Sequence, residues 1–442
     1  MKTLIKNATI INEGQSFVGS VVIVNDIIEQ VLSNEPSGDF DRIIDATGLM
    51  LIPGVIDDQV HFREPGLTHK GEIYTEAKAA VAGGVTSYME MPNTNPQSTT
   101  VHLLEEKYKK AAEVSLANYS FYIGATNTNI NEVLKANPNN VCGIKCFMGS
   151  STGNMLVEGE GLKTLFENAH MLVATHCEEE AIIQKNTQHF FEKYGENMPV
   201  KYHPQIRSAK ACYQSTFKAI NLAHKYNTRL HVLHLSTAIE MELFSPGKLA
   251  NKKITNEVCV HHLWFDERDY ETHGNFIKWN PAIKTEHDKH ALQKAINTGI
   301  IDVVATDHAP HTLEEKNNSY FKAPSGGPLV QHSLVGMLEM VKQGIFTYEK
   351  VVEMMCHNPA ILFQIDNRGF IREGYKADLV IINPSNNWIV SPENILYKCK
   401  WSPFTGETFS HSITSTFVNG HLAFQNGEFD EAQKGERLQF NR

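Results

Sequence analysis

The sequence predicts an α/β fold in which a closed (β/α)8 TIM barrel carries a small composite β-sandwich. Eight short apolar runs alternate with stretches of helical spacing through the middle of the chain. Apolar strands that alternate with helices indicate a parallel sheet covered on both faces. Eight such units fit a closed barrel better than an open doubly wound sheet, and no glycine-rich phosphate fingerprint follows the first run. Both flanks of the chain show the period-two alternation of short antiparallel strands.

The repeating pattern can be followed in the letters. The apolar runs are LIPGVIDDQV, GVTSYMEM, NYSFYIGAT, VCGIKCFM, HMLVATH, TRLHVLHL, ITNEVCVHHL and IIDVVAT. Helix-favouring residues at helical spacing lie between most of them, as in EIYTEAKAAVAGG, SAKACYQSTFKAINLAHKY and EHDKHALQKAINTG. Each strand is therefore expected to be followed by a helix that packs on the outside of the barrel.

We expect three segments along the chain. Residues 1–53 form the N-terminal part of the sandwich, 54–365 form the barrel, and 366–442 form the C-terminal part of the sandwich. Neither flank makes a convincing domain by itself, so the two should join beside the barrel. Residues 185–205 are polar and lack a strand signal, which is typical of a long segment near the barrel mouth.

Composition and charge exclude several classes of protein. A hydrophobic share of 41% and a charged share of 20% are ordinary for a globular chain. A net charge of −10 and the lack of a Lys/Arg-rich run argue against a nucleic-acid or anionic-membrane surface. The start, MKTLIKNATIINEG, lacks the long apolar stretch of a signal peptide. We therefore expect a cytoplasmic protein that binds neither nucleic acid nor membrane.

The seven cysteines suggest neither a disulfide framework nor a zinc ribbon. Their number is odd and they show no C-x-x-C pairing. Most lie in apolar runs, where a free thiol acts as a small hydrophobic group. We expect a structural role for all seven.

Polar side chains follow the apolar runs at the points where the strands end. In a barrel of this kind these ends converge on one mouth, which is where active sites lie. Ordinary solvated loops would show Ser, Asn, Asp, Gly and Lys more often than His or Asp in register. The residues are His61 and Arg63, Asn93, Lys145, His176, His234, His262 and Asp307. The pattern predicts a metal-dependent active site.

Strand geometry refines the choice of ligands. Residues two apart on a strand point to the same side, so Gln59 and His61 face the barrel interior together. His231 and His234 are three apart and face opposite sides; His234 ends its run and is the better ligand, while His231 is expected to be structural. Asp307 caps the last run, where a carboxylate can bind a metal and also carry a proton.

Lys145 is the unusual member of this set, because it lies within the apolar strand GIKCFMG. Burial should lower the pKa of its ammonium group and make the neutral amine reactive. One interpretation is a buried ion pair. The other is that the amine takes up carbon dioxide and becomes a carbamate whose two oxygens bridge two metal ions. The spacing alone favours neither.

Several motifs together resemble the dihydroorotases of the amidohydrolase superfamily, which are cyclic amidohydrolases. They are PGVIDDQVHFREPG, MPNTNP, GIKCFM, HCE, HVLHLST, NPAIK and ATDHAPHTLEEK. The closing stretch GFIREGYKADLVII is similar to that superfamily's return into the sandwich. The most specific motif is ATDHAPH followed by Lys316, and the resemblance extends over residues 1–425.

The resemblance implies a zinc-dependent hydrolase of the same barrel-and-sandwich architecture. Its reaction would be the reversible conversion of dihydroorotate to N-carbamoyl-L-aspartate in pyrimidine (UMP) biosynthesis. The family's members are often homodimers, although composition points to no interface.

Carried onto this chain, the resemblance gives a metal centre with one or two Zn²⁺ ions. His61, Lys145 and Asp307 would bind one ion, and Lys145, His176 and His234 the other, with N6-carboxylysine at Lys145 as the bridge. A water between the ions would attack the ring amide carbonyl. Asp307 would take the proton of that water and deliver it to the departing ring nitrogen.

The resemblance also assigns residues to the substrate. Arg63, Asn93 and His311 match the clamp on the substrate carboxylate, for which a planar guanidinium is well suited. Asn280 in NPAIK matches a contact to the pyrimidine ring amide.

Two departures from the family pattern bear on the site. The family has His-x-His where this chain has Gln59-Val60-His61, and an amide oxygen is a weaker zinc donor than imidazole. Gln59 is therefore at most a weak ligand, and we expect looser metal binding at that position without loss of activity. The segment APSGGPLVQHSL also differs from the usual Gly-rich form.

Two other functions remain open. One is a hydantoinase or allantoinase, against which Arg63 and His311 argue, because hydantoins lack the carboxylate that these residues would bind. The other is a non-catalytic scaffold for a partner such as aspartate transcarbamoylase. Gln59 favours the scaffold, whereas the retention of the other site residues argues against it.

Overall fold

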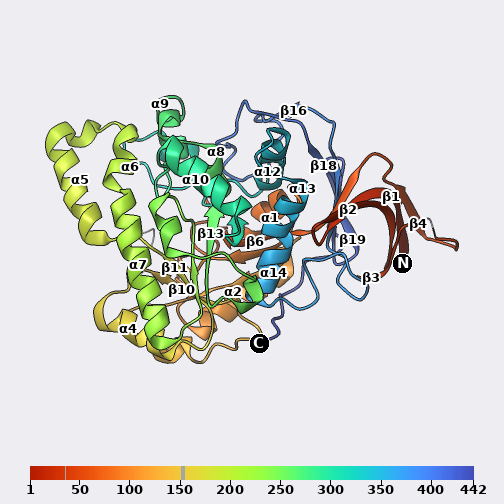
Figure 1. Ribbon diagram of the computed structural model, residues 1–442, viewed down its shortest axis with the longest axis horizontal. Coiled ribbons are helices and arrows are strands. Elements are labelled where there is room, and N and C mark those ends of the chain that lie inside the picture. Colours follow the sequence, from red (N-terminus) through yellow and green to blue (C-terminus); the bar gives the residue numbers. More distant parts are fainter. Residues whose placement is uncertain (35, 151–154) are drawn as a thin grey trace.

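The computed structural model describes residues 1–34, 36–150 and 155–442. A barrel of parallel strands surrounded by helices makes up one part of the molecule, and a sheet built from both ends of the chain lies beside it (Figure 1). The expected barrel with a composite sandwich is confirmed.

The barrel strands are short, and neighbouring strands pair in parallel except between β8 and β9. They are β6 (Val55–Val60), β7 (Val85–Glu90), β8 (Asn118–Phe121), β9 (Ile123–Gly124), β10 (Ile144–Phe147), β11 (Val173–His176), β12 (Leu230–Val232), β13 (Ile254–Cys259) and β14 (Val303–Ala305). The third apolar run is divided into β8 and β9, of which β8 pairs with β7 and β9 with β10. A parallel bridge between Val60 and His308 closes the barrel, and His61 N donates to His308 O at 2.7 Å.

Helices cover the outside of the barrel, as the alternating pattern predicts. They are α1 (Ile73–Ala82), α2 (Val101–Val114), α3 (Ile130–Val133), α4 (Gly159–Asn168), α5 (Glu180–Tyr194), α6 (His203–Ile206), α7 (Ala209–Tyr226), α8 (Val260–Trp264), α9 (Tyr270–His273), α10 (Glu286–Asn297), α11 (Leu313–Lys316), α12 (Ser333–Lys342), α13 (Tyr348–Val352) and α14 (Asn358–Phe363). Local signals set their ends: the Ser208 hydroxyl accepts from Ala211 N at the start of α7, and Asn227 ends it with φ 58°.

The two ends of the chain share one nine-stranded sheet. Its strands are β1 (Lys2–Asn12), β2 (Gln15–Val24), β3 (Ile27–Leu32), β4 (Arg42–Asp45), β5 (Met50–Pro53), β15 (Leu379–Asn383), β18 (Ser412–Val418), β19 (His421–Gln425) and β20 (Glu428–Phe429). A separate hairpin pairs β16 (Trp388–Ile389) with β17 (Thr408–Phe409). Strand β15 pairs antiparallel with β5, which joins the two halves. Ile28 N donates to Tyr375 O, so the sheet curls back on itself around an apolar core.

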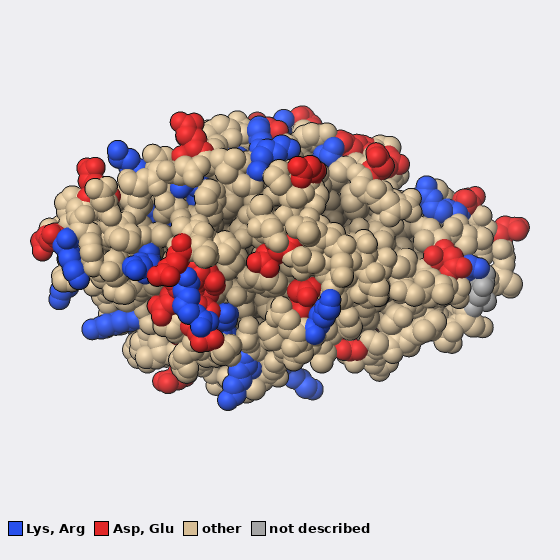
Figure 2. Space-filling view, turned by 90° about the horizontal axis from the view of Figure 1, so that it is seen from above, with Lys and Arg blue, Asp and Glu red and all other residues tan. Residues whose placement is uncertain are grey.

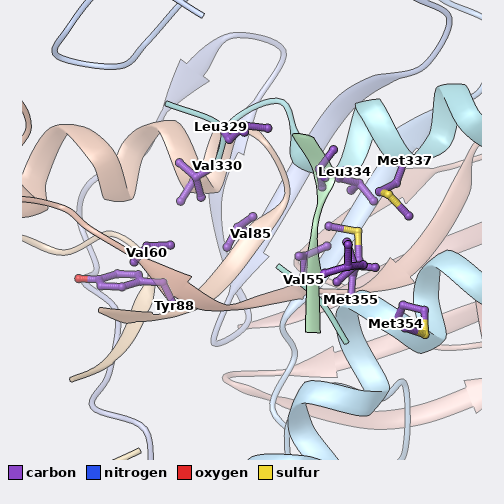
Figure 3. Close-up of a cluster of buried hydrophobic side chains, with 14 of the residues drawn as sticks. Val55, Val60, Val85, Tyr88, Leu329, Val330, Leu334, Met337, Met354 and Met355 are labelled. Atoms are coloured by element: carbon purple, nitrogen blue, oxygen red, sulfur yellow. The ribbon is translucent and has the colours of Figure 1, made fainter. Parts of the chain in front are cut away.

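One part of the hydrophobic core lies where the first two barrel strands meet the last helices (Figure 3). Val55 and Val85 from β6 and β7 face Leu334 of α12 and Met355 of the π-helical turn Glu353–His357. All four side chains are buried. Their close packing holds the N-terminal end of β6 in place and so orients its C-terminal end, which carries the site residues.

The segment 185–205 lies against the barrel mouth. The second part of helix α5 forms its first half, and Phe190 packs in a small apolar cluster with Tyr320. His203 contacts the Tyr320 hydroxyl at 2.7 Å and the Trp279 carbonyl at 2.6 Å. The segment thereby supports the loops that surround the site.

The surface agrees with the mixed composition. On the face shown in Figure 2, cationic and acidic side chains are interspersed. Among the described residues, no helix is long and apolar enough to span a membrane.

Candidate active site

A small cavity of about 110 Å³ lies at the carboxyl ends of the barrel strands. Fifteen residues line it: Gln59, His61, Arg63, Asn93, Lys145, Phe147, His176, His234, Trp279, Asn280, Asp307, Ala309, Pro324, Ser325 and Gly326. Nine of the eleven residues predicted for the site are in this set. The exceptions are His311, which lies beside Arg63, and His262, which lies on α8 outside the cavity lining. The structure therefore gathers side chains that are up to 248 positions apart in the sequence.

The first pair of predicted ligands joins the two ends of the barrel sequence. His61 Nε2 lies 3.1 Å from Asp307 Oδ1, and His61 Nδ1 lies 2.9 Å from Asn93 Oδ1. Because the Asn93 oxygen only accepts, Nδ1 carries the ring proton and Nε2 presents its lone pair to a carboxylate. Burial lowers the His61 pKa well below its ordinary value, so the ring is neutral. Two lone pairs that face each other at this distance are satisfied by a cation or a proton between them.

The second pair joins β11 to the end of β12. His176 Nδ1 lies 3.0 Å from His234 Nε2, and His176 Nε2 lies 3.0 Å from Glu178 Oε2. The Glu178 carboxylate only accepts, so it holds the proton of His176 on Nε2 and leaves Nδ1 free to bind a metal. Arg207 pairs with Glu178 from the other side and keeps the Glu178 pKa low, at about 2, against the effect of burial.

Lys145 lies on β10, close enough to both pairs for its charge to interact with theirs. Burial lowers its pKa to about 8, although the carboxylates of Asp307 and Glu257 act in the opposite direction. Its charge in turn contributes to lowering the pKa values of His61 and His176. Among the described residues, no carboxylate forms an ion pair with Lys145. Its amine is 4.6 Å from the centre of the Phe147 ring. The structure thus does not place Lys145 in a buried ion pair.

Gln59 turns its amide nitrogen towards the site. Nε2 donates to Asp307 Oδ1 at 3.2 Å, while Oε1 faces Cys259 Sγ at 3.8 Å. In this orientation the amide oxygen points away from Asp307, and the weak-ligand role of Gln59 stays a prediction.

His231 lies beneath the cavity and does not line it. Its Nε2 contacts Asp58 at 3.3 Å and Glu257 at 3.2 Å, and all three side chains are buried. The other oxygen of Glu257 accepts from the backbone N–H of His234 at 3.1 Å. These contacts hold the strand end that carries His234.

Three residues of the site have left-handed backbone conformations. Arg63, His234 and Asp307 have φ values of 70°, 40° and 47°, in the left-handed region that side chains other than Gly, Asn and Asp seldom adopt. Strained positions of this kind cluster where function fixes a side-chain direction. The strain at Arg63 could not be predicted from the sequence, because arginine has no preference for left-handed backbone.

The loops after β6 and β7 are packed tightly against each other. Gly66 has φ 84°, and a Cβ atom there would lie 2.0 Å from the Asn95 carbonyl oxygen. Only glycine permits this approach, which brings the loop of Arg63 against the loop of Asn93.

Arg63 is buried beside His311. Its Nε donates to Pro310 O at 3.1 Å, and its Nη2 lies 3.1 Å from His311 Nε2. Lys70 Nζ is 3.0 Å from His311 Nδ1, and an ammonium group only donates. His311 therefore carries its proton on Nε2, where it donates to Ser325 O at 3.0 Å. Arg63 and His311 thus present N–H groups side by side.

Three features of the site were not predicted. Lys70 fixes the proton of His311, Trp279 forms part of the wall, and residues 324–326 close one side. Lys278 and Lys316 hold this last loop by donating to its carbonyl oxygens. A lysine followed by glycine (Lys70-Gly71) and a lone tryptophan are too common in loops to have been recognised without the contacts.

The residues present fit a zinc centre. Neutral imidazoles and a carboxylate are ordinary zinc ligands. The lone pairs of His61 Nε2 and Asp307 Oδ1 face each other at 3.1 Å, and His176 Nδ1 faces His234 Nε2 at 3.0 Å. Both observations are expected of a site whose ligands are oriented for a metal ion.

Comparison with known proteins gives a consistent family. A sequence model of the Amidohydrolase family matches residues 50–423. The chain is 31% identical over 408 residues to the dihydroorotase of Methanosphaera stadtmanae, which covers 92% of each chain. It is 33% identical over 439 residues to the dihydroorotase of Enterococcus faecalis, which covers 98% of this chain and all of that one.

Solved structures show the same fold. The L-hydantoinase (dihydropyrimidinase) of Arthrobacter aurescens superimposes with a TM-score of 0.94 at 25% identity and covers 99% of both chains. The dihydropyrimidinase of Brevibacillus agri gives a TM-score of 0.89 at 24% identity over the full length of both chains.

Proposed function

Because this chain belongs to the amidohydrolase family and is a hydrolase that acts on cyclic amides, we propose that its substrate is (S)-dihydroorotate. The product of hydrolysis is N-carbamoyl-L-aspartate, and the reaction belongs to pyrimidine (UMP) biosynthesis. The relatives named dihydroorotase, which align over nearly the whole chain, support this proposal. A cytoplasmic location and a homodimer stay predictions.

The observation that carries the proposal is the buried guanidinium of Arg63. Burial lowers its pKa only to about 10, so it is charged at neutral pH. No described carboxylate forms an ion pair with it, and a buried charge is costly unless it is paired. A substrate carboxylate would accept from Arg63, while the adjacent His311, whose Nε2–H donates to Ser325 O, stays a predicted member of the clamp. Dihydroorotate brings such a carboxylate into the cavity.

Asn280 supports the orientation of the ring. Its Oδ1 atom lines the cavity and has no hydrogen-bond partner among the described residues. Buried oxygens of this kind nearly always accept a hydrogen bond. We assign this oxygen to an N–H of the pyrimidine ring, which places the ring between Asn280 and the clamp.

The metal centre we propose uses the two pairs described above. His61 and Asp307 would hold one zinc ion, His176 and His234 the other, and Lys145 as N6-carboxylysine would bind both. Zinc supplies an activated water and polarises the ring carbonyl. The low pKa of Lys145 supports the modification, because carbon dioxide reacts with the neutral amine.

Asp307 is the proposed proton carrier. Burial raises its pKa to about 7, which is close to the value that suits a general acid–base group at neutral pH. Its carboxylate would accept a proton from the attacking water. It would then deliver that proton to the ring nitrogen as the carbon–nitrogen bond breaks, which yields the open-chain product.

The runner-up function is a hydantoinase, and the two solved structures named above, an L-hydantoinase and a dihydropyrimidinase, are the reason to consider it. Arg63 separates the two proposals, since hydantoins carry no carboxylate for it to bind. A non-catalytic scaffold is the third candidate, and Gln59 is its best support.

The test is a substrate panel with metal analysis. The full-length protein is prepared in zinc-supplemented medium, its zinc content is measured by emission spectroscopy, and hydrolysis of dihydroorotate, hydantoin, dihydrouracil and allantoin is compared. We expect bound zinc and a kcat/KM for dihydroorotate that exceeds the others. Preference for hydantoin would establish the runner-up, and a metal-free inactive protein would establish the scaffold.

A further inference from the structure

A second group of metal-competent side chains lies at the end of β13. Cys259, His261 and His262 each offer one ligand atom, and these three atoms lie within 4.8 Å of one another. All three side chains are buried. We call them the Cys–His–His cluster. The sequence predicts a structural role for Cys259, but these neighbours set it apart from the other buried thiols.

The hydrogen bonds of the cluster leave lone pairs unused. His262 Nε2 lies 3.1 Å from the Pro281 carbonyl oxygen and therefore carries the ring proton. Its Nδ1 atom then presents a lone pair, and that atom has no hydrogen-bond partner among the described residues. Neither ring nitrogen of His261 has a partner with ordinary hydrogen-bond geometry, although the Thr306 backbone lies near enough to oppose in part the lowering of the His261 pKa by burial. Buried polar atoms seldom lack partners, so three in one place call for an explanation.

The rings are held in place by their neighbours. His261 stacks on Trp279 with the ring centres 4.2 Å apart and an interplanar angle of 14°, and its centre is 4.1 Å from that of His262. An imidazole binds a metal in its own plane, so stacking on Trp279 leaves the ring edge of His261 free to do so. The cluster is thus ordered before any ligand arrives.

We propose that the Cys–His–His cluster binds a thiophilic divalent cation of the zinc class, at a site separate from the two ligand pairs of the cavity. One thiolate and two imidazoles are a common zinc ligand set. Binding replaces the thiol proton of Cys259, which leaves to solvent. The ion fills the space towards which the unpartnered nitrogens are directed.

Gln59 is the fourth donor in this arrangement. Its Oε1 atom faces Cys259 Sγ at 3.8 Å, while its Nε2 atom donates to Asp307. The amide oxygen therefore lies beside the Cys–His–His cluster, and the amide nitrogen donates a hydrogen bond within the cavity. The proposal does not require dihydroorotate to be the substrate, because none of its ligands belongs to the clamp or to the two pairs.

Cobalt absorption tests the proposal directly. The full-length protein is produced with Co²⁺ in place of zinc, and its near-ultraviolet spectrum is recorded. A thiolate ligand gives an intense charge-transfer band, whereas the ligands proposed for the cavity contain no sulfur. We expect the band in the wild-type protein and its loss, together with one equivalent of metal, in Cys259→Ser.

The matched control is Cys356→Ser. Cys356 is also buried, and its thiol contacts Pro53 O at 3.4 Å, away from both sites. This variant should keep the band and the full metal content. A wild-type protein without the band, or a band that persists in Cys259→Ser, would overturn the proposal whether or not the enzyme hydrolyses dihydroorotate.

A second measurement covers the case in which Cys259→Ser does not fold. X-ray absorption at the zinc edge of the wild-type protein should show a sulfur neighbour at about 2.3 Å in addition to nitrogen and oxygen neighbours. Zinc surrounded only by nitrogen and oxygen would refute the proposal without any variant.

Discussion

The Nε2 atom of His61 lies 3.1 Å from Oδ1 of Asp307, although 246 positions separate the two residues. The neutral ring directs a lone pair at the carboxylate, so the folded protein is stabilised by any cation that comes between them. A ligand that binds only the folded state raises stability in proportion to the logarithm of its concentration over Kd.

Chelation should therefore lower the melting temperature. Free zinc at a hundredfold excess over its Kd adds about 2.7 kcal/mol to the free energy of unfolding. We therefore expect the chelated protein to melt at least about 3 °C below the zinc-loaded protein. Calorimetry of both forms measures the difference. Zinc should restore the higher value and magnesium should not, because magnesium prefers oxygen ligands. Equal melting temperatures with and without chelator would argue against a metal centre.

The Lys145→Ala variant tests the bridging carbamate. Loss of an outer-shell partner already costs about 10–100-fold in metal affinity or activity, so loss of the bridge should lower kcat by more than about 100-fold. Short carboxylic acids should restore part of the activity, because their two oxygens can take the place of the carbamate. Steady-state hydrolysis with and without propionate measures both effects. Wild-type turnover in the variant would refute the carbamate.

The strand-end pattern explains why much of the site could be predicted from the sequence. Apolar runs that stop at His61, His176, His234 and Asp307 place these residues at one mouth as soon as the barrel closes, and barrel closure follows from eight repeated units. This inference needs only strand direction and not side-chain detail. It fails for residues whose role depends on a particular rotamer or on a contact between loops.

Lys70 and the Cys–His–His cluster are examples of such residues. Lys70 lies 241 positions from His311, and no periodicity links a loop lysine to a histidine so far away. The apolar run predicts a hydrophobic thiol at Cys259, and the unpartnered nitrogens beside it are evident only in three dimensions. The strand-end pattern predicts His262 but not its proximity to Cys259. The direction of the Gln59 amide likewise depends on Asp307 and Cys259 together.

The Gln59→His variant restores the family's His-x-His pattern. An imidazole at this position would add a strong ligand beside His61, so zinc should leave the cavity more slowly. We expect the rate of zinc transfer to a chelator to fall by about tenfold, with hydrolysis retained. Stopped-flow transfer to a coloured chelator measures it, with Gln331→His as a control away from the cavity. An unchanged rate would show that position 59 does not reach the metal.

The pH dependence of stability should report the burial of Lys278. Burial, with a contribution from Arg207, lowers its pKa from 10.5 to about 7. Between these values the unfolded chain binds a proton that the folded chain does not, so the free energy of unfolding rises with pH across this window. Its Nζ also donates to Tyr320 O and Ala323 O, beside the loop that closes the cavity.

Replacing Lys278 with Met removes this titration. The free energy of unfolding should rise between about pH 7.5 and 9.5, where only the unfolded protein binds the Lys278 proton. We expect this rise to be smaller in Lys278→Met than in the wild-type protein. Urea denaturation at the two pH values measures the difference, and Lys201→Met, on the surface, controls for loss of a lysine. Identical slopes in all three proteins would mean that Lys278 remains charged when folded.

The Arg63→Met variant decides between dihydroorotate and a hydantoin as the substrate. Arg63 is buried beside His311 with no described carboxylate as its partner, so the substrate's acid group would be its counter-charge. Removing one member of a buried charge pair costs about 2–5 kcal/mol, which corresponds to a rise of roughly 30-fold or more in KM for dihydroorotate. Hydrolysis of hydantoin, which has no carboxylate, should change little. Arg372→Met, which removes an arginine paired with Glu13 outside the cavity, should leave both KM values as they are. If KM for dihydroorotate were also unchanged in Arg63→Met, Arg63 would not bind the substrate carboxylate. The main argument against the hydantoinase proposal would then be lost.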